Sequence, residues 1–446
     1  MKPPKTLIRI GFALLIVVAT VLVVRAVFNY TEGRMLARTL AGLKERGIPL
    51  SAKDLAPPCT DEDNAARLWK AAESLLTSED QESRKAIAGA FGRYAGGLPV
   101  EPGVLDVVRR LAAANETALG LVAEMGAKPC FRLRDPDRPL YESLLPSAPK
   151  MINATRLLGF SALFRAEDGD VAGAVDRAVA GLRSAPLVAG EGNLMAWLIA
   201  LADTRMMAHF LGEICRGRDL PEETLARLIG ELDPPAWRER LAAAVRGERI
   251  VFIEVAGLAS RGGTKDLAWL FGEPSRIKNL GIWLARPLVR RDVRKTLPRY
   301  DELEALALRP FFESRPVLRE QAEAMKALPW HAFLTKSTWA NQEAAFMKGA
   351  VLEATLLASR TGLACRLYKS RNGTYPEALE ALVPGILAEV PVDPFTGRPL
   401  VYRREGEGFI VYSLGTNEKD DGGRSTYMIK HMITDKDDDW AWREDR

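Results

Sequence analysis

The chain has few of the residues from which metal sites and nucleophilic active sites are built. Its 446 residues include three histidines and four cysteines. The cysteines are scattered, with no C-x-x-C pair, so the spacing of a zinc site is absent. No histidine lies in an H-E-x-x-H arrangement, and the chain has no G-x-S-x-G sequence. These absences exclude the common motifs of zinc and serine hydrolases.

The cysteines leave two interpretations open. If they lie outside the cytoplasm, Cys59, Cys130, Cys215 and Cys365 can form two disulfides, in any of three pairings. Alternatively, the four are buried free thiols. The scattered spacing is compatible with both states.

The chain also lacks a strong excess of charge of either sign. Its formal net charge is +4, which is too small to indicate a nucleic-acid partner. Hydrophobic residues make up 47% of the chain and charged residues 27%, as in ordinary folded proteins. A chain of this length is sufficient for two or three domains, each with its own core.

What the chain does have is a long apolar segment at its N-terminus. Residues 10–24 carry no charge and are almost all apolar, and three basic residues precede them. Counted as residues 7–28, with Arg9 and Arg25 at the two interfaces, the segment has 22 residues, which is enough to cross a bilayer. Basic residues ahead of such a segment favour a cytoplasmic N-terminus and export of everything after it.

We therefore expect residues 1–6 in the cytoplasm and residues 7–28 as an uncleaved transmembrane signal anchor. A cleaved signal peptide is the alternative, but no small-x-small cleavage site follows the apolar run. Gly11-Phe12 resembles the cleavage site of type IV prepilins. Ile16 stands where that family has Glu, which argues against prepilin processing.

Residues 29–340 show the pattern of amphipathic helices joined by short polar or Pro-containing segments. The clearest pair of helices flanks an E-D-G-D turn at residues 167–170. Small residues on both sides of this turn allow the helices to approach closely, as in tetratricopeptide-type hairpins: Ala162, Ala166, Ala174 and Ala178. No second copy recurs at a fixed period. We expect an extracytoplasmic α-helical domain of packed helical hairpins.

Two other features of this region favour structural interpretations. His209 has Glu213 one turn further on, but without a second histidine nearby it is expected to lie in the core. Residues 276–299 carry eight Lys or Arg and one Asp, with apolar residues between them. Such a segment could rest on an anionic membrane surface. A solvated basic face, packed on the domain through its apolar side, is the interpretation we favour.

The last hundred residues follow a different pattern, which predicts a helix and then a small sheet. A long helix is expected first, with a leucine stripe formed by Leu352, Leu356, Leu363 and Leu367. The sequence R-N-G-T-Y-P at 371–376 ends that helix. Two β-branched and aromatic runs within residues 400–414, joined through Gly406 and Gly408, predict a β-hairpin.

Four motifs occur in order in this region: LYKSRNGTYPEALEALV, DPFTGRPLVY, FIVYSLGTNEKDDGG and the terminal DDWAW. In this order they resemble the soluble domain of the major pseudopilin of type II secretion systems. The resemblance implies an α+β module over residues 341–446, with a small antiparallel sheet and a calcium-binding loop after Y-S-L-G. In pseudopilins this domain directly follows the membrane helix. Residues 29–340 intervene here, so filament assembly is not implied.

The loop also has the residue types that calcium prefers, since calcium takes six to eight hard oxygen ligands. Neighbouring glycines allow the backbone to turn tightly around an ion. Asn417 stands where the family often has Asp. The expected ligands are the Leu414 carbonyl and the side chains of Asn417, Asp420, Asp421, Asp438 and Asp439. Salt bridges to Arg424, Lys430 and Lys436 are the alternative way to neutralise these carboxylates.

Together these features predict a mainly α-helical protein with a single pass through the bacterial inner membrane and its bulk in the periplasm. We expect it to act as a scaffold or interaction protein beside a secretion or envelope assembly, with a protein partner that the sequence does not identify. The alternative function is a membrane-anchored hydrolase. That alternative requires a cleft of the helical domain in which catalytic carboxylates converge.

Overall fold

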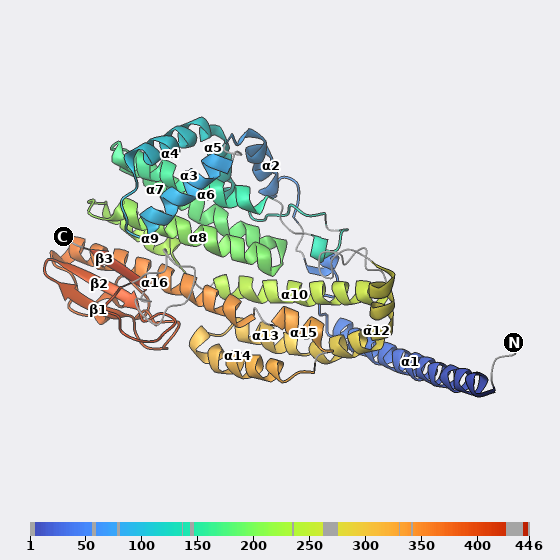
Figure 1. The fold of residues 1–446 in the computed structure, drawn as a ribbon. Coiled ribbons are helices and arrows are strands. Elements are labelled where there is room, and N and C mark those ends of the chain that lie inside the picture. The colour runs from blue at the N-terminus through green and yellow to red at the C-terminus, as the bar shows by residue number, and fades with distance from the viewer. Residues whose placement is uncertain are drawn as a thin grey trace.

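The structure is a computed structural model that describes residues 5–55, 59–77, 81–135, 137–142, 147–233, 236–261, 275–329, 331–339, 342–424 and 440–444. A long body of packed helices has a small antiparallel sheet at one end, and a helix projects from the other end (Figure 1). The expected mainly α-helical fold with a small C-terminal sheet is confirmed.

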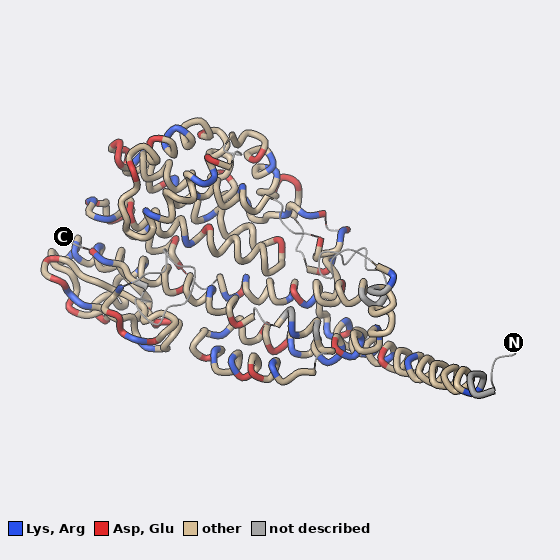
Figure 2. Tube along the Cα trace, viewed as in Figure 1, with Lys and Arg blue, Asp and Glu red and all other residues tan. Residues whose placement is uncertain are grey.

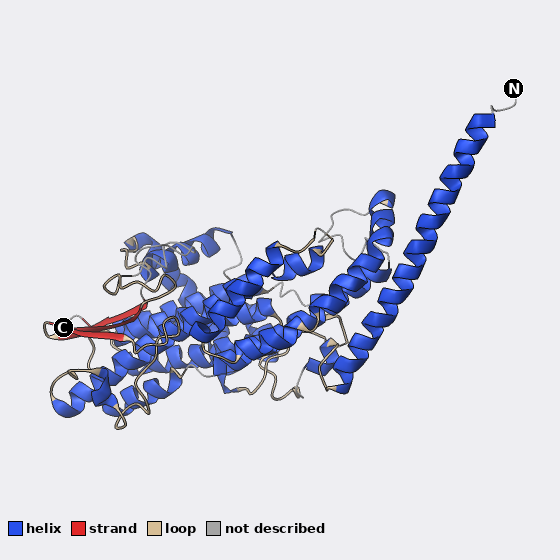
Figure 3. Cartoon of the chain, turned by 90° about the horizontal axis from the view of Figure 1, so that it is seen from below, coloured by secondary structure: helices blue, strands red, loops and turns tan. Residues whose placement is uncertain are grey.

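The projecting helix is α1 (Lys5–Glu45), which runs without a break for 41 residues, or about 60 Å at the usual helical rise. Its most apolar eighteen-residue window has a mean hydropathy of 2.7 and no buried residue. The later part of the helix lies along the body, where Glu32 and Leu43 are buried (Figure 3). By length and composition, the free part of α1 is sufficient to cross a membrane.

The first half of the body carries the predicted hairpin. Its helices are α2 (Ala66–Leu75), α3 (Gln81–Ala95), α4 (Pro102–Ala114), α5 (Glu116–Glu124), α6 (Ala148–Glu167), α7 (Val171–Ser184), α8 (Leu194–Cys215) and α9 (Glu222–Glu231). The expected turn joins α6 to α7: Gly169 has a φ of 96°, and the Asp170 side chain accepts a hydrogen bond from the Gly173 N–H. All four alanines around this turn are buried, which confirms the close approach of the two helices.

The second half of the body is a second layer of helices, drawn below α8 in Figure 1. Its helices are α10 (Ala236–Arg261), α12 (Arg276–Thr296), α13 (Arg299–Ala307), α14 (Phe311–Lys326), α15 (Phe333–Trp339) and α16 (Gln342–Asn372). Short 3₁₀ helices are η1 (Ala52–Leu55), η2 (Met125–Ala127), η3 (Leu140–Glu142), η4 (Ala185–Glu191) and η6 (Leu379–Leu382).

α8 is apolar enough to be a second membrane helix, but 72% of its apolar window is buried. It is therefore a core helix.

The sheet contains β1 (Val401–Glu405), β2 (Gly408–Ser413) and β3 (Trp440–Glu444), in that order and antiparallel throughout. The first two strands form the predicted hairpin, in which Glu405 pairs with Gly408 and Val401 with Tyr412. On the other edge, Val411 of β2 pairs with Trp442 of β3. Every residue of the central strand β2 is buried.

One hydrophobic core joins the helical body to the C-terminal module. Phe409, Val411 and Trp442 belong to the same buried cluster as Trp197 and the predicted leucine stripe of α16. α16 ends at Asn372, and Gly373 follows with a φ of 80°, as expected from the R-N-G-T-Y-P sequence. Because the core is continuous, residues 342–424 and 440–444 pack against the body and do not form a separate core.

The cysteines combine the two states that the sequence left open. Cys59 and Cys130 form a disulfide, with their Cα atoms 6.1 Å apart. Cys215 in α8 and Cys365 in α16 are free and buried. Asn64, which pairs with Cys130 in an isolated β-bridge, helps to hold the segment after α5 against the start of α2.

Candidate functional site

The loop after β2, residues 414–424, is the part of the predicted calcium site that the structure describes. It turns sharply: Gly415, Gly422 and Gly423 all have positive φ angles, and Glu418 has a φ of 57°. Glycine adopts this left-handed conformation without steric cost. The tight backbone that a metal loop requires is therefore present.

The base of the loop is fixed by Asp393, which comes from the D-P-F-T-G turn. Its side chain is 1% exposed. The carboxylate accepts hydrogen bonds from the Leu414 N–H at 2.9 Å, the Ser413 hydroxyl at 2.8 Å and the Phe395 N–H at 2.9 Å. A buried carboxylate with several donors holds its backbone partners strongly. Asp393 thus joins two loops of the module, a role that the sequence motif did not assign.

The described calcium-ligand candidates make hydrogen bonds within the loop. Asp420 Oδ1 accepts from the Tyr412 hydroxyl at 2.8 Å and from the Gly422 N–H at 2.9 Å. Asn417 Nδ2 donates to Asp421 Oδ2 at 2.8 Å, and Asn417 Oδ1 accepts from the Lys419 N–H at 2.8 Å. Side-chain oxygens of these three residues therefore lie on one short loop, and each already has a local donor.

Calcium requires more oxygens than this half of the site supplies. Within the described ranges no group of three or more His, Cys, Asp or Glu is arranged to hold a metal ion. Asp438 and Asp439, the other two carboxylates of the prediction, lie outside the described residues, as do Lys430 and Lys436. Arg424 donates through Nε to the Asp421 backbone carbonyl at 3.0 Å. The calcium site stays a prediction that depends on the terminal acidic cluster.

An arginine from the helical body reaches the same loop. Arg315, in the first turns of α14, donates to the Thr416 carbonyl at 2.8 Å and also pairs with the Glu418 carboxylate. The same end of α14 holds the D-P-F-T-G turn, since the Phe312 N–H donates to the Pro394 carbonyl at 2.9 Å. Arg315 lies about a hundred residues before the loop, so no local spacing could have indicated it.

Three buried or half-buried carboxylates of the body hold backbone groups in place. Glu248 of α10 accepts from the Leu194 N–H at 3.2 Å, which caps the start of α8. Glu254, also on α10, accepts from the Tyr141 N–H at 3.1 Å. Glu191 accepts hydrogen bonds from two successive N–H groups at 133–134. Burial raises the pKa of all three carboxyl groups, but their partners indicate a structural role.

Asp203 of α8 is buried, and His209 of the same helix is half-buried. His209 packs edge-on against Phe91 and Tyr94, with ring centroids 6.3 and 5.6 Å apart, as expected for a core histidine. Burial lowers its pKa to about 4. Asp203, one and a half turns earlier, accepts a hydrogen bond from Thr155, and burial raises its pKa to about 7. Asp203 lacks the access to solvent that a general acid or base requires, and the aromatic packing of His209 indicates a structural role.

Comparisons of the chain with protein-family models, with curated proteins and with solved structures found no match. The resemblance of residues 341–446 to the major pseudopilin therefore stays a prediction based on its motifs.

Proposed function

We propose that this protein is a membrane-anchored scaffold whose helical body holds a pseudopilin-like module outside the cytoplasm. The observation that carries the proposal is the free part of α1, which is long, apolar and wholly exposed. Exposed apolar surface of this extent is costly in water and normal in a bilayer. In Figure 2 the projecting part of α1 is almost entirely free of charged residues.

Two further features support the scaffold role. The anchor and the C-terminal sheet lie at opposite ends of the molecule (Figure 1), so the body would present the module away from the membrane. The Cys59–Cys130 disulfide is typical of a compartment outside the cytoplasm. Glu191, Glu248 and Glu254 of the body bind backbone N–H groups, so these three carboxylates do not support the hydrolase alternative.

Labelling of single cysteines tests the topology. Leu308 is 52% exposed, so a Leu308→Cys variant should react with a membrane-impermeant maleimide in intact spheroplasts. A Lys2→Cys variant should react only after lysis, because the basic N-terminus is expected to stay inside. Labelling of the Leu308→Cys variant only after lysis would show that the body lies in the cytoplasm, opposite to the proposed orientation. Release of the protein from membranes by alkaline carbonate would contradict the proposed membrane anchor. A mature chain that starts after the apolar segment would contradict it as well.

We also propose that calcium stabilises the loop at 414–424 together with Asp438 and Asp439. Because the module shares its core with the body, the test uses the full chain in detergent. A ligand at a hundred times its Kd stabilises the folded state by about 2.7 kcal/mol, so the melting midpoint should rise by several degrees. Calcium should raise the midpoint relative to chelator, and Asp421→Asn should reduce that rise. An unchanged midpoint at saturating calcium would exclude the ion.

A further inference from the structure

The membrane helix continues into the body without a flexible linker. The predicted span ends at residue 28, and Glu32, one turn later in the same unbroken helix, is already buried. Four residues of helix extend about 6 Å. If α1 crosses the bilayer, the end of the body around α12 must therefore lie at the level of the lipid headgroups.

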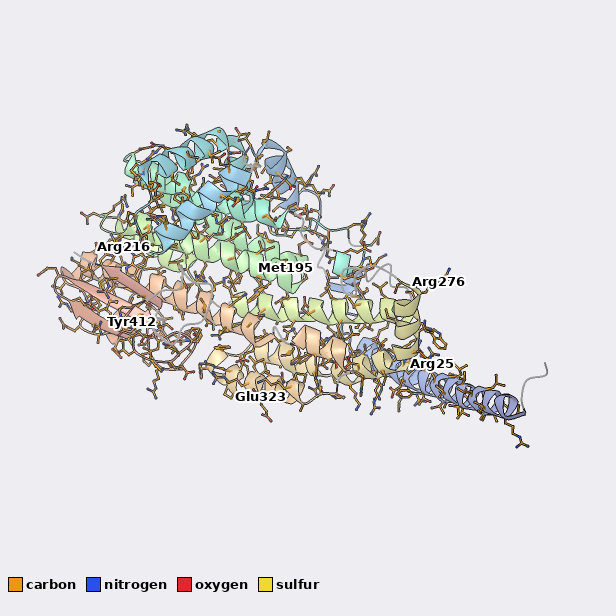
Figure 4. The ribbon with its side chains drawn as sticks, in the orientation of Figure 1. Arg25, Met195, Arg216, Arg276, Glu323 and Tyr412 are labelled. Atoms are coloured by element: carbon orange, nitrogen blue, oxygen red, sulfur yellow. A yellow bond between two sulfur atoms is a disulfide. The ribbon has the colours of Figure 1, made fainter. Side chains whose placement is uncertain are left out.

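α12 packs along α1 at the point where α1 leaves the body. The guanidinium of Arg25 lies 3.3 Å from the ring centre of Trp283. One to two turns further on, Arg290 Nη1 donates to the Asn29 carbonyl at 2.9 Å, and Arg294 pairs with Glu32 at 2.9 Å. In Figure 4, Arg276 and Arg25 are labelled at the same end of the body, where the helix projects. The start of α12 thus lies beside the predicted interface.

The charge of α12 at this place is positive and only partly compensated. Its N-terminal half carries Arg276, Lys278 and Arg286 and no acidic residue, and the one acidic residue of the helix, Asp292, lies in the C-terminal half. Asp292 is buried and accepts hydrogen bonds from Thr335, so its charge faces the interior. Burial and the positive charge of Arg286 lower the pKa of Arg290. An anion beside them would relieve this repulsion.

The apolar residues in the two halves of α12 differ in their exposure to solvent. In the C-terminal half, Val289 and Val293 are 1% and 2% exposed, which agrees with a helix packed on the body. In the N-terminal half, Leu280 and Leu284 are 57% and 46% exposed. Exposed leucines between basic residues, beside a membrane helix, are typical of a segment that lies in the membrane interface.

We infer that the N-terminal half of α12 contacts the membrane surface and binds the phosphate headgroups of anionic phospholipids, with Leu280 and Leu284 inserted among the lipids. This inference rests on the proposed membrane anchoring. It adds a second contact that fixes the tilt of the rigid body on the membrane, since a lone helix would leave the body free to rotate about it.

The test uses a fluorophore attached to single cysteines of the full chain, reconstituted into vesicles. Cys215 and Cys365 are buried and the other two native cysteines are bonded, so added surface cysteines can be labelled selectively. The three variants are Leu280→Cys on α12, Val17→Cys inside the span, and Leu75→Cys on α2. Leu75 serves as the control, because its side chain is 47% exposed and α2 is distant from α1 in Figure 1. Spin-labelled phosphatidylcholine is the quencher. The vesicles contain phosphatidylcholine alone, or phosphatidylcholine with about a third phosphatidylglycerol.

We expect quenching at positions 17 and 280 to be several-fold stronger than at position 75, and stronger at position 280 when phosphatidylglycerol is present. In the position-280 background, Arg276→Glu with Arg286→Glu should remove the phosphatidylglycerol effect. The same charge change at Lys85 and Arg110, which are exposed on α3 and α4, should leave it intact.

The outcomes separate the two proposals. Strong quenching at position 17 with quenching at position 280 no greater than at position 75 would overturn the surface contact and leave the anchor standing. Quenching at position 280 that does not depend on phosphatidylglycerol would overturn the headgroup specificity. No quenching at position 17 would overturn the anchor, and the surface contact with it.

Discussion

At the scale of single residues, most buried charge in this protein is neutralised by a specific partner. Arg249, which is 1% exposed, pairs with Asp301 at 2.8 Å, and Asp393 accepts three hydrogen bonds. Asp203 is less fully paired: it is 2% exposed and accepts a hydrogen bond from Thr155, but its Oδ1 atom has no hydrogen-bond partner within the described ranges. Burial of a carboxylate whose oxygens are only partly hydrogen-bonded disfavours the charged form.

The raised pKa of Asp203 predicts a pH dependence of stability. Burial raises this pKa from 3.8 to about 7, against the opposing charge of Arg156. Between those values the folded state binds more protons than the unfolded state, so the free energy of unfolding should fall as the pH rises. The loss is on the order of 2–4 kcal/mol. Asp203→Asn should be close to the parent protein at pH 4 and more stable than it at pH 8, as measured by urea unfolding.

His209 shifts the profile in the opposite direction, which is why the variant is compared with the parent at each pH. Its pKa of about 4 in the folded state means that stability is lost as the pH falls from about 6.5. This contribution is the same in both proteins and cancels in the difference. A difference that does not change between pH 4 and pH 8 would show that Asp203 is charged in the folded protein.

At the scale of elements, the sheet and α16 meet through a glycine. The Trp442 ring of β3 lies over Gly362, where a Cβ atom would be 2.4 Å from the ring. Trp442 also approaches Gly212 of α8, where a Cβ atom would be 3.2 Å away. Glycine is a poor helix former, so its presence in the middle of α16 is explained by this close approach of a strand to two helices.

Gly362→Ala should therefore destabilise the protein by about 1–3 kcal/mol, because overpacking outweighs the gain in helix propensity. The matched control is Gly89→Ala in α3, where nothing lies within 4 Å of the added Cβ. That variant should be unchanged or more stable by up to about 1 kcal/mol. Thermal melts of the two variants measure the contrast. Equal midpoints would mean that Trp442 does not pack on α16.

The same scale shows what local patterns predicted well. The α6–α7 hairpin, the end of α16 at R-N-G-T-Y-P and the β1–β2 hairpin all follow from residues that are close in sequence. The attachment of the module to α14 does not, because Arg315 and the loop it holds are about a hundred residues apart. Spacing along the chain carries information about turns and amphipathic faces, and very little about which distant faces meet.

At the scale of the whole molecule, two of the four cysteines form a disulfide and the other two are buried free thiols. Burial raises the pKa of Cys215 to about 12 and also raises the pKa of Cys365, and only the thiolate reacts readily. The native, unreduced protein should show no thiol reactive toward a disulfide reagent. Two should react after unfolding and four after reduction and unfolding.

Removal of the disulfide should also cost stability, since it closes a loop across 71 residues. Disulfides typically stabilise a protein by about 2–4 kcal/mol, and the chain-entropy relation for a loop of this length gives a value near the upper end of that range, about 4 kcal/mol. The double variant Cys59→Ser with Cys130→Ser should unfold at correspondingly lower denaturant. Four reactive thiols in unreduced, unfolded protein from native membranes would contradict the bond and weaken the assignment to an oxidising compartment.

The sequence by itself determined the elements of this protein: a free apolar helix, amphipathic hairpins and a terminal β-hairpin with a glycine-rich loop. Each depends on residues within a few turns of one another, where periodicity and backbone preference decide the structure. The tertiary structure alone decided which cysteines pair, that Arg315 reaches the loop, and that α12 lies beside α1. These three contacts depend on how apolar faces far apart in the sequence pack into one continuous core. Many different spacings along the chain would allow such packing, so the spacing alone does not predict which faces meet.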